Sequence, residues 1–289
     1  MKNKNFISIL IFLIFILITK NLYAEDFYFE TPEILSFEEG NLLKSNKGGK
    51  AITEDNVEII ADEFEYNKIT SLLIARKNVI IIDPINKTIL KANKVHYLKN
   101  KEIISTKGKT KIDVENKYII RSSDIIYERN NKIISSKEFT TIEDNKENFY
   151  TTEGFKYTSL NSLLRGKKIT VITKEKDEYI IEQGIINLET NELRGKDVEA
   201  NFHKELFDNP ENEPRLKGNT IYTDQNITRI SKGVFTTCKR RDGKCPPWLI
   251  KSRKVKHDKN KKTIYYKDAW LKVYDVPIMY YPTFFHPDP

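Results

Sequence analysis

Short segments of the chain alternate between apolar and polar residues, which is typical of a β-strand with one buried face. Phe64 and Tyr66 flank Glu65, and Val95 and Tyr97 flank His96. The alternation predicts an all-β fold of antiparallel strands from about residue 51 to residue 230. It places the following residues on one interior face: Phe64, Tyr66, Val95, Tyr97, Ile125, Tyr127, Phe155, Tyr157 and Ile185.

The alternating segments recur at a nearly constant interval. Tyr66, Tyr97, Tyr127 and Tyr157 follow one another after 31, 30 and 30 residues. Each segment is followed by a turn-like patch containing asparagine, a residue that tolerates positive φ and marks tight hairpins. We therefore predict repeats of about 30 residues, each of two antiparallel strands, with hairpins near Asn67, Asn100, Asn130, Asn161, Asn191, Asn226 and Asn260.

Stacked repeats of this kind bury their apolar faces only against their neighbours. Two arrangements satisfy that requirement. The strands can close into a tight sandwich with an ordinary side-chain core, or they can form a V-shaped trough with an apolar lining. The alternation is the same in both, so the pattern leaves the choice open.

The first residues have the order of a secretory signal peptide. Lys2 and Lys4 precede an uncharged apolar run over residues 6–18, and Ala24 is the expected last residue removed. An uncleaved membrane anchor would need roughly 20 apolar residues, more than this run provides. We therefore expect residues 1–24 to be a signal peptide, residues 25–50 a linker, and the rest of the chain to be exported.

Composition and charge narrow the class of protein. Hydrophobic residues make up 39% and charged residues 31% of the chain, which excludes a disordered tail and a multi-span membrane protein. The net charge is +8, and loss of Lys2, Lys4 and Lys20 with the signal leaves 8 − 3 = +5. Lysines on every solvated face account for this charge, and export argues against nucleic acid as a partner.

The sequence offers no pattern typical of an enzyme or of a cofactor site. The four histidines are not paired at helical metal-binding spacing, and the chain has no HExxH, GxSxG or glycine-rich phosphate loop. Cys238 and Cys245 are the two cysteines, and only His257 lies near them as a further metal ligand. In an oxidising compartment such cysteines favour a disulfide over a metal site.

The segment from Cys238 to Pro289 is rich in proline and aromatic residues and carries a series of short motifs. Pro-Pro-Trp ends at Trp248, and an alternating strand leads to His257-Asp258. Tyr-Tyr-x-x-Ala spans residues 265–269, Val-Pro-Ile-x-Tyr-x-Pro spans residues 276–282, and His-Pro-Asp-Pro follows. In order and spacing this segment resembles the lipopolysaccharide-assembly protein family (LptD, also called organic solvent tolerance protein).

The resemblance implies that residues 51–235 are an OstA-like periplasmic β-jellyroll forming a V-shaped groove. In that family the jellyroll accepts lipopolysaccharide from a soluble periplasmic protein of the same fold, and acyl chains lie in the groove. A C-terminal barrel, plugged by an outer-membrane lipoprotein, delivers the lipid to the cell surface. The nine interior residues named above are then the expected groove lining, at the periplasmic side of the outer membrane.

The resemblance also implies that residues 236–289 lead towards a barrel, and we expect this chain to lack one because no series of alternating strands follows Pro289. Family members link such cysteines to partners near the barrel. Without those partners, Cys238 and Cys245 are expected to bond to each other.

Two other functions fit parts of the sequence. A soluble or inner-membrane component of the same transport bridge would share the jellyroll but lack the segment after Cys238. A structural β-repeat scaffold would continue its repeats unchanged to a capped end, whereas here they meet the segment rich in proline and aromatic residues.

Overall fold

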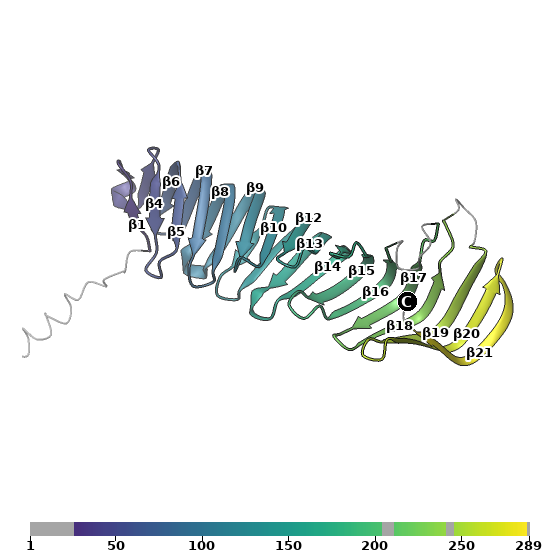
Figure 1. The fold of residues 1–289 in the computed structure, drawn as a ribbon. Coiled ribbons are helices and arrows are strands. Elements are labelled where there is room, and N and C mark those ends of the chain that lie inside the picture. Colours follow the sequence, from purple (N-terminus) through teal and green to yellow (C-terminus); the bar gives the residue numbers. More distant parts are fainter. Residues whose placement is uncertain (1–25, 204–210, 241–245, 288–289) are drawn as a thin grey trace, which may run out of the picture.

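The computed structural model describes residues 26–203, 211–240 and 246–287. Over these residues the chain forms one 21-stranded sheet, which Figure 1 shows as a long row of strands running from β1 to β21. From β12 onward each strand pairs antiparallel with the next strand in the chain. The fold is therefore all-β and antiparallel, as the alternation predicted.

The strands lengthen after the first few. They are β1 (Tyr28–Glu30), β2 (Leu35–Phe37), β3 (Leu42–Ser45), β4 (Gly49–Ile52), β5 (Glu58–Ala61), β6 (Glu63–Asn67), β7 (Leu72–Asp83), β8 (Thr88–Leu98), β9 (Ile103–Val114), β10 (Tyr118–Ser123), β11 (Ile126–Glu128), β12 (Ile133–Asp144), β13 (Phe149–Thr158), β14 (Leu163–Ile172), β15 (Glu178–Asn187), β16 (Leu193–Asn201), β17 (Arg215–Thr223), β18 (Ile227–Thr236), β19 (Trp248–Asp258), β20 (Thr263–Val273) and β21 (Val276–Pro287).

Irregularities near the middle of the strands divide the sheet into two arms. The register between β7 and β8 shifts at Lys77 and Asn78, which have φ of 62° and 51°. Extra residues of this kind interrupt the ladder and bend a strand. The isoleucine arm is the half that carries Ile81, Leu90, Ile112, Ile120 and Ile142, and the tyrosine arm is the half that carries Tyr66, Tyr97, Tyr127 and Tyr157.

The turns of the tyrosine arm lie at the seven predicted asparagines. The asparagine is not generally the residue with positive φ. Ser71, Glu102 and Lys132 take that conformation at three of these turns, with φ of 52–54°. Asn67 instead accepts a hydrogen bond at Oδ1 from the backbone N–H of Thr70, at 3.0 Å, so its side chain closes the turn.

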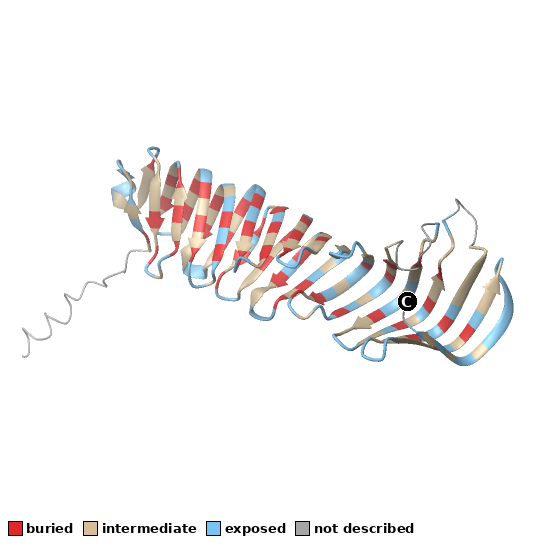
Figure 2. Cartoon of the chain, viewed as in Figure 1, coloured by how far each residue is buried: buried red, intermediate tan, exposed pale blue. Residues whose placement is uncertain are grey.

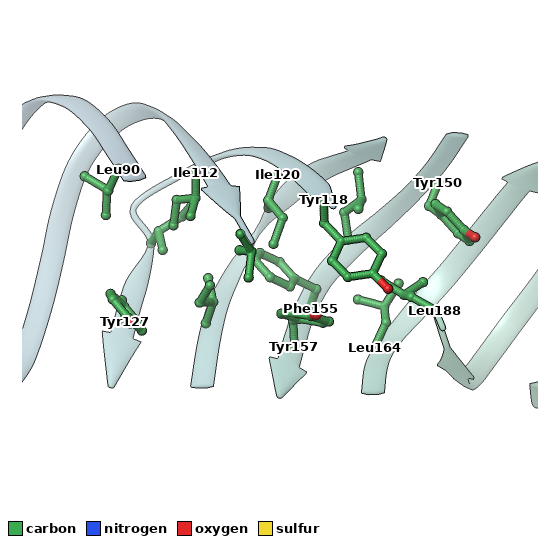
Figure 3. Close-up of a cluster of buried hydrophobic side chains, with 14 of the residues drawn as sticks. Leu90, Ile112, Tyr118, Ile120, Tyr127, Tyr150, Phe155, Tyr157, Leu164 and Leu188 are labelled. Carbon is green, nitrogen blue, oxygen red and sulfur yellow. The ribbon is translucent and has the colours of Figure 1, made fainter. Parts of the chain in front are cut away.

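In the N-terminal half of the sheet the two arms pack against each other. Eight of the nine predicted interior residues are buried there, none more than 5% exposed, and they belong to one continuous core. Tyr118 of the isoleucine arm meets Tyr157 of the tyrosine arm, with ring centroids 5.7 Å apart (Figure 3). This half therefore adopts the sandwich, and each fully buried isoleucine contributes roughly 1.5–3 kcal/mol.

Ile185 is the exception among the nine. Its side chain is 38% exposed on the outer face, whereas Ile186 is buried. Ile186 pairs with Leu164, which pairs with Tyr157, so Ile186 continues the interior row of the tyrosines. That row advances by 29 residues here, one fewer than the predicted interval, and a shift of one residue in a strand moves a side chain to the opposite face.

The predicted linker at residues 25–50 is wrong, because four strands of the sheet begin between residues 28 and 49. β1 pairs with β4, and β3 pairs with both β2 and β6. Phe27 is buried, and its ring makes edge contacts with Tyr66 at 5.0 Å and with Tyr97 at 5.6 Å. Strands of three or four residues are too short to show alternation in the sequence, which is why the segment resembled a linker.

Within residues 236–289, the strands β19, β20 and β21 also continue the sheet, so the predicted boundary at 235 is not a structural one. β18 pairs with β19, β19 with β20, and β20 with β21. The prolines Pro277, Pro282 and Pro287 all lie on β21, which has one partner strand in the described part of the chain. An edge strand tolerates proline because its outer backbone groups need no partner.

No helix in the described ranges is long and apolar enough to cross a membrane. The predicted signal peptide, residues 1–24, lies outside those ranges.

Candidate functional site

The nine residues predicted to line a groove do not face open space. Eight are side chains of the closed core and Ile185 lies on the outer face. Figure 2 shows the buried positions concentrated in the N-terminal half of the row and thinning towards β21. These residues therefore do not line a groove as predicted, because the two arms pack against each other at the eight buried positions.

A buried ionic cluster joins the two arms in this shut half. Arg129 follows β11 in the tyrosine arm, and its side chain is 4% exposed. Its Nε donates to Oδ2 of Asp83, at the end of β7 in the isoleucine arm, at 2.8 Å. Its other nitrogens donate to Asp55 at 2.7 Å, to the hydroxyl of Tyr97 at 2.8 Å, and to Glu102. We call Arg129, Asp55, Asp83 and Glu102 the Arg129 cluster.

The charges of this cluster are held by their mutual contacts. Burial alone would raise the pKa of Asp83, but hydrogen bonds from Arg129 and Asn86 lower it below its ordinary value. Burial also acts to raise the pKa of Asp55, but hydrogen bonds from Thr53 and Arg129 outweigh it and lower this pKa to about 2. Burial opposes the charge of Arg129, and Asp83 and Asp55 nevertheless raise its pKa. All three groups therefore stay ionised at neutral pH.

These pKa shifts predict a pH dependence of stability. A carboxylate whose pKa is lowered in the folded state contributes stability above its unfolded pKa, about 3.9, and loses it as pH falls further. In an Arg129→Met variant Asp83 stays buried without its cation. Protonation of Asp83 therefore removes a buried, unpaired charge and raises the stability of the variant. The difference in unfolding free energy between wild type and variant should shrink as pH falls from 5 towards 2. Urea unfolding at several pH values measures it, and a constant difference would contradict the assignment.

The open space lies in the C-terminal half, where the arms separate. A cavity of about 510 Å³ runs between them, with lining residues from β13 to β21. Because neighbouring strands lie about 4.8 Å apart, it extends for roughly 40 Å along the sheet. Apolar side chains of the isoleucine arm line one wall: Tyr150, Val171, Tyr179, Ala200, Leu216 and Phe235. Ile186, Leu193 and Ile264 line the opposite wall.

Glycines mark the place where the closed core ends. Phe155 pairs with Gly166, and the same row continues through Gly184 and Gly195 in the next two strands. A Cβ at Gly195 would stand 2.6 Å from Cγ2 of Ile181, so a side chain does not fit there. The row carries Phe64, Val95 and Phe155 in the closed half, whereas at these glycines the side chains of Thr152 and Ile181 take up the space that a Cβ would need.

Polar residues gather where the arms end on either side of this cavity. Glu175 and Asp177 lie in the turn after β14, and Lys259 lies in the turn after β19 on the other arm. Burial lowers the pKa of Lys259, although Asp224 nearby opposes that change. Asp177 accepts hydrogen bonds from the backbone and the ring Nδ1 of His203, at 2.9 and 2.7 Å. The cavity thus has apolar walls and a polar mouth, an arrangement suited to an amphiphile.

The metal and disulfide predictions fall partly outside the structure. In the described ranges, no group of three or more His, Cys, Asp or Glu side chains is placed to hold a metal ion. Sγ of Cys238 lies 3.7 Å from the carbonyl oxygen of Trp248. Cys245 is not among the residues described, so the bond between the two cysteines stays a prediction.

Sequence reasoning missed both the Arg129 cluster and the cavity. Arg129 and Asp83 are 46 residues apart in a chain with charges on most strands, and nothing local separates a buried arginine from a solvated one. The cavity had a weak signal. Gly166, Gly184 and Gly195 stand in strands that otherwise alternate, and glycine inside a strand often marks a close approach or a place where something must fit.

The chain matches no protein-family model and no curated protein sequence. The geometry of the cavity and the residues that carry the resemblance are therefore the basis for a proposed function.

Proposed function

We propose that this chain is a lipid-conducting domain of lipopolysaccharide transport, with acyl chains carried in the cavity between the arms. The observation that carries the proposal is an apolar cavity with a polar mouth that runs along the sheet from β13 to β21. An acyl chain left in water costs about 0.8 kcal/mol per CH₂, so transport across an aqueous compartment requires such a lining. Similar side chains on successive strands let a lipid advance without a single fixed site.

The wider assignment rests on the sequence. The motifs between Cys238 and Pro287 resemble the LptD family, and the first 24 residues resemble a signal peptide. We therefore propose an exported protein at the periplasmic side of the outer membrane. Its partners would be lipopolysaccharide, a periplasmic bridge protein of the same fold and, as in the full-length family, an outer-membrane lipoprotein.

Photo-crosslinking tests the proposal at three aromatic positions, each replaced by a photoreactive phenylalanine. Tyr179 lines the cavity, Phe155 lies in the closed core, and Phe139 is 62% exposed on the outer surface. Labelled lipopolysaccharide should be captured from Tyr179 and not from Phe155 or Phe139. Aromatic residues at all three positions keep the three replacements comparable.

Two results would count against the proposal. Equal capture from Tyr179 and Phe139 would mean adhesion to the surface, and no capture from Tyr179 would mean that the cavity does not take the lipid. Capture from Phe155 would instead show that the closed half opens during transport.

A structural scaffold is a second candidate for the N-terminal half alone. The observation in its favour is that its interior is filled, with Tyr97, Ile104 and Ile120 among the largest fully buried side chains. In that case the closed half is a structural support that takes no part in binding. Truncating the cavity-lining side chains beyond β13 should then abolish all lipid capture by the chain.

A further inference from the structure

The outer face of the tyrosine arm carries a concentration of cations in the C-terminal half. One row crosses the sheet through Arg165, Arg194, Arg229 and Lys256, which are joined by continuous strand pairing from β14 to β19. All but Lys256 are exposed. No carboxylate interrupts this row, whose other members are Ile185, Tyr222, Tyr265 and Phe285.

A second row runs beside the first, nearer the bend. Its cations are Lys167, Lys196, Lys254 and Lys267, all exposed, and the residues paired between them are Gln183, Thr220 and Ser231. We call the cations of these two rows the basic face. The pairing places all of them on one side of one sheet, so they form a single surface.

The cations of the basic face are almost all without an acidic partner. Within the described residues only Lys256 makes an ion pair, with Asp258 at 3.1 Å. On the other arm several cations are paired, on the strands and in the loop after β18. Glu199 binds both Lys217 at 2.9 Å and Arg240 at 2.8 Å. A lysine-rich composition would put cations on both arms alike, and it does not explain why ion pairs are concentrated on one arm and almost missing from the basic face.

Aromatic rings lie between these cations. The guanidinium of Arg194 stands 5.2 Å from the ring centre of Tyr222, and that of Arg229 stands 6.0 Å from it on the next strand. The ammonium of Lys256 is 5.7 Å from the ring of Tyr265. Cations held on tyrosines, which are amphipathic rings, are the composition that favours the headgroup region of a membrane.

We propose that the basic face docks on the surface of an anionic phospholipid bilayer. Unpaired cations gathered on one face of a sheet are complementary to such a surface, and each cation near it strengthens binding about fivefold. The proposal is independent of lipid conduction, because a docking face of this kind requires no open cavity. It also gives the domain a defined orientation, with the outer side of the tyrosine arm against the membrane.

Vesicle co-flotation of residues 25–289, the chain expected after removal of the signal peptide, tests the proposal, using phosphatidylcholine vesicles with and without phosphatidylglycerol. The wild-type chain should bind only the anionic vesicles, and binding should weaken at high salt because the Debye length falls to about 3 Å at 1 M. A basic-face variant combines four substitutions: Arg194→Gln, Lys196→Gln, Arg229→Gln and Lys254→Gln. It should bind about 600-fold more weakly, at about fivefold for each cation.

The control variant removes the same charge from the other arm and the loops at its end, through Lys217→Gln, Lys239→Gln, Arg240→Gln and Lys251→Gln. It should bind almost as wild type does. Equal loss in the two variants would show that net charge alone matters and would overturn the proposal. Binding to duplex DNA without binding to anionic vesicles would overturn it too, in favour of a nucleic-acid surface. Circular dichroism establishes that both variants keep the β-sheet, and the four single variants, each expected to lose about fivefold, provide an independent check.

Discussion

Replacing Arg129 by methionine is expected to lower the free energy of unfolding by about 3–5 kcal/mol at neutral pH. Arg129 is the only cation that contacts Asp83 directly among the described residues, and the Asp83 side chain is fully buried. Removing the guanidinium leaves that carboxylate in the interior without its charge partner, and it also leaves the hydroxyl of Tyr97 without one of its hydrogen bonds. Urea unfolding, followed by circular dichroism, measures the loss.

Arg121→Met is the matched control for this prediction. Arg121 pairs with Glu143 at 2.7 Å, but both side chains are more than 40% exposed. Exposed ion pairs contribute at most about 1 kcal/mol, so this variant should stay close to wild type. A double variant, Asp83→Leu with Arg129→Met, should recover much of the stability lost in the single variant, because no buried charge is then left alone. Equal losses in Arg121→Met and Arg129→Met would show that the Arg129 cluster does not hold the arms together.

Replacing Leu216 by aspartate is expected to weaken lipopolysaccharide binding about 100-fold or more. Leu216 lines the cavity between Ala200 and Phe235, where bound acyl chains would surround its side chain. An isolated carboxylate among acyl chains costs several kcal/mol, and 1.4 kcal/mol corresponds to a factor of ten in affinity. Leu216 is only partly buried, so without lipid the aspartate can face water and the fold is retained. Equilibrium binding of labelled lipopolysaccharide measures the effect.

Ile180→Asp, in β15 on the arm away from the basic face, serves as the control for Leu216→Asp. It makes a similar change from a branched aliphatic side chain to a carboxylate, in a strand of the same half, but on the outer face. Its lipid affinity should remain within about threefold of wild type, since exposed substitutions change little. If both variants lose affinity equally, the lipid binds the outer surface. If neither does, the cavity is not the lipid site and the proposed function fails.

The sequence alone predicted the strands, the turns and the inward side chains of the N-terminal half. These features are local. The direction of a side chain follows from a period of two, and a turn follows from the few residues at its tip. Phe64, Tyr66, Val95 and Tyr97 therefore lie inside as predicted. The predictions differ from the structure where a local pattern was absent, as in the short strands of residues 28–52, or where one missing residue shifted the interval, as at Ile185.

What the tertiary structure decided is which part of the sheet is closed and which is open. The same alternation runs through both halves, so it cannot distinguish a filled interior from a cavity. The closed half depends on Arg129 meeting Asp83, 46 residues away, and on Tyr118 meeting Tyr157 across the arms. The open half begins where Gly166, Gly184 and Gly195 come into one row. Contacts between distant residues and the register of successive strands set the distance between the arms. Neither is encoded in any single strand, so the alternation could not predict that distance.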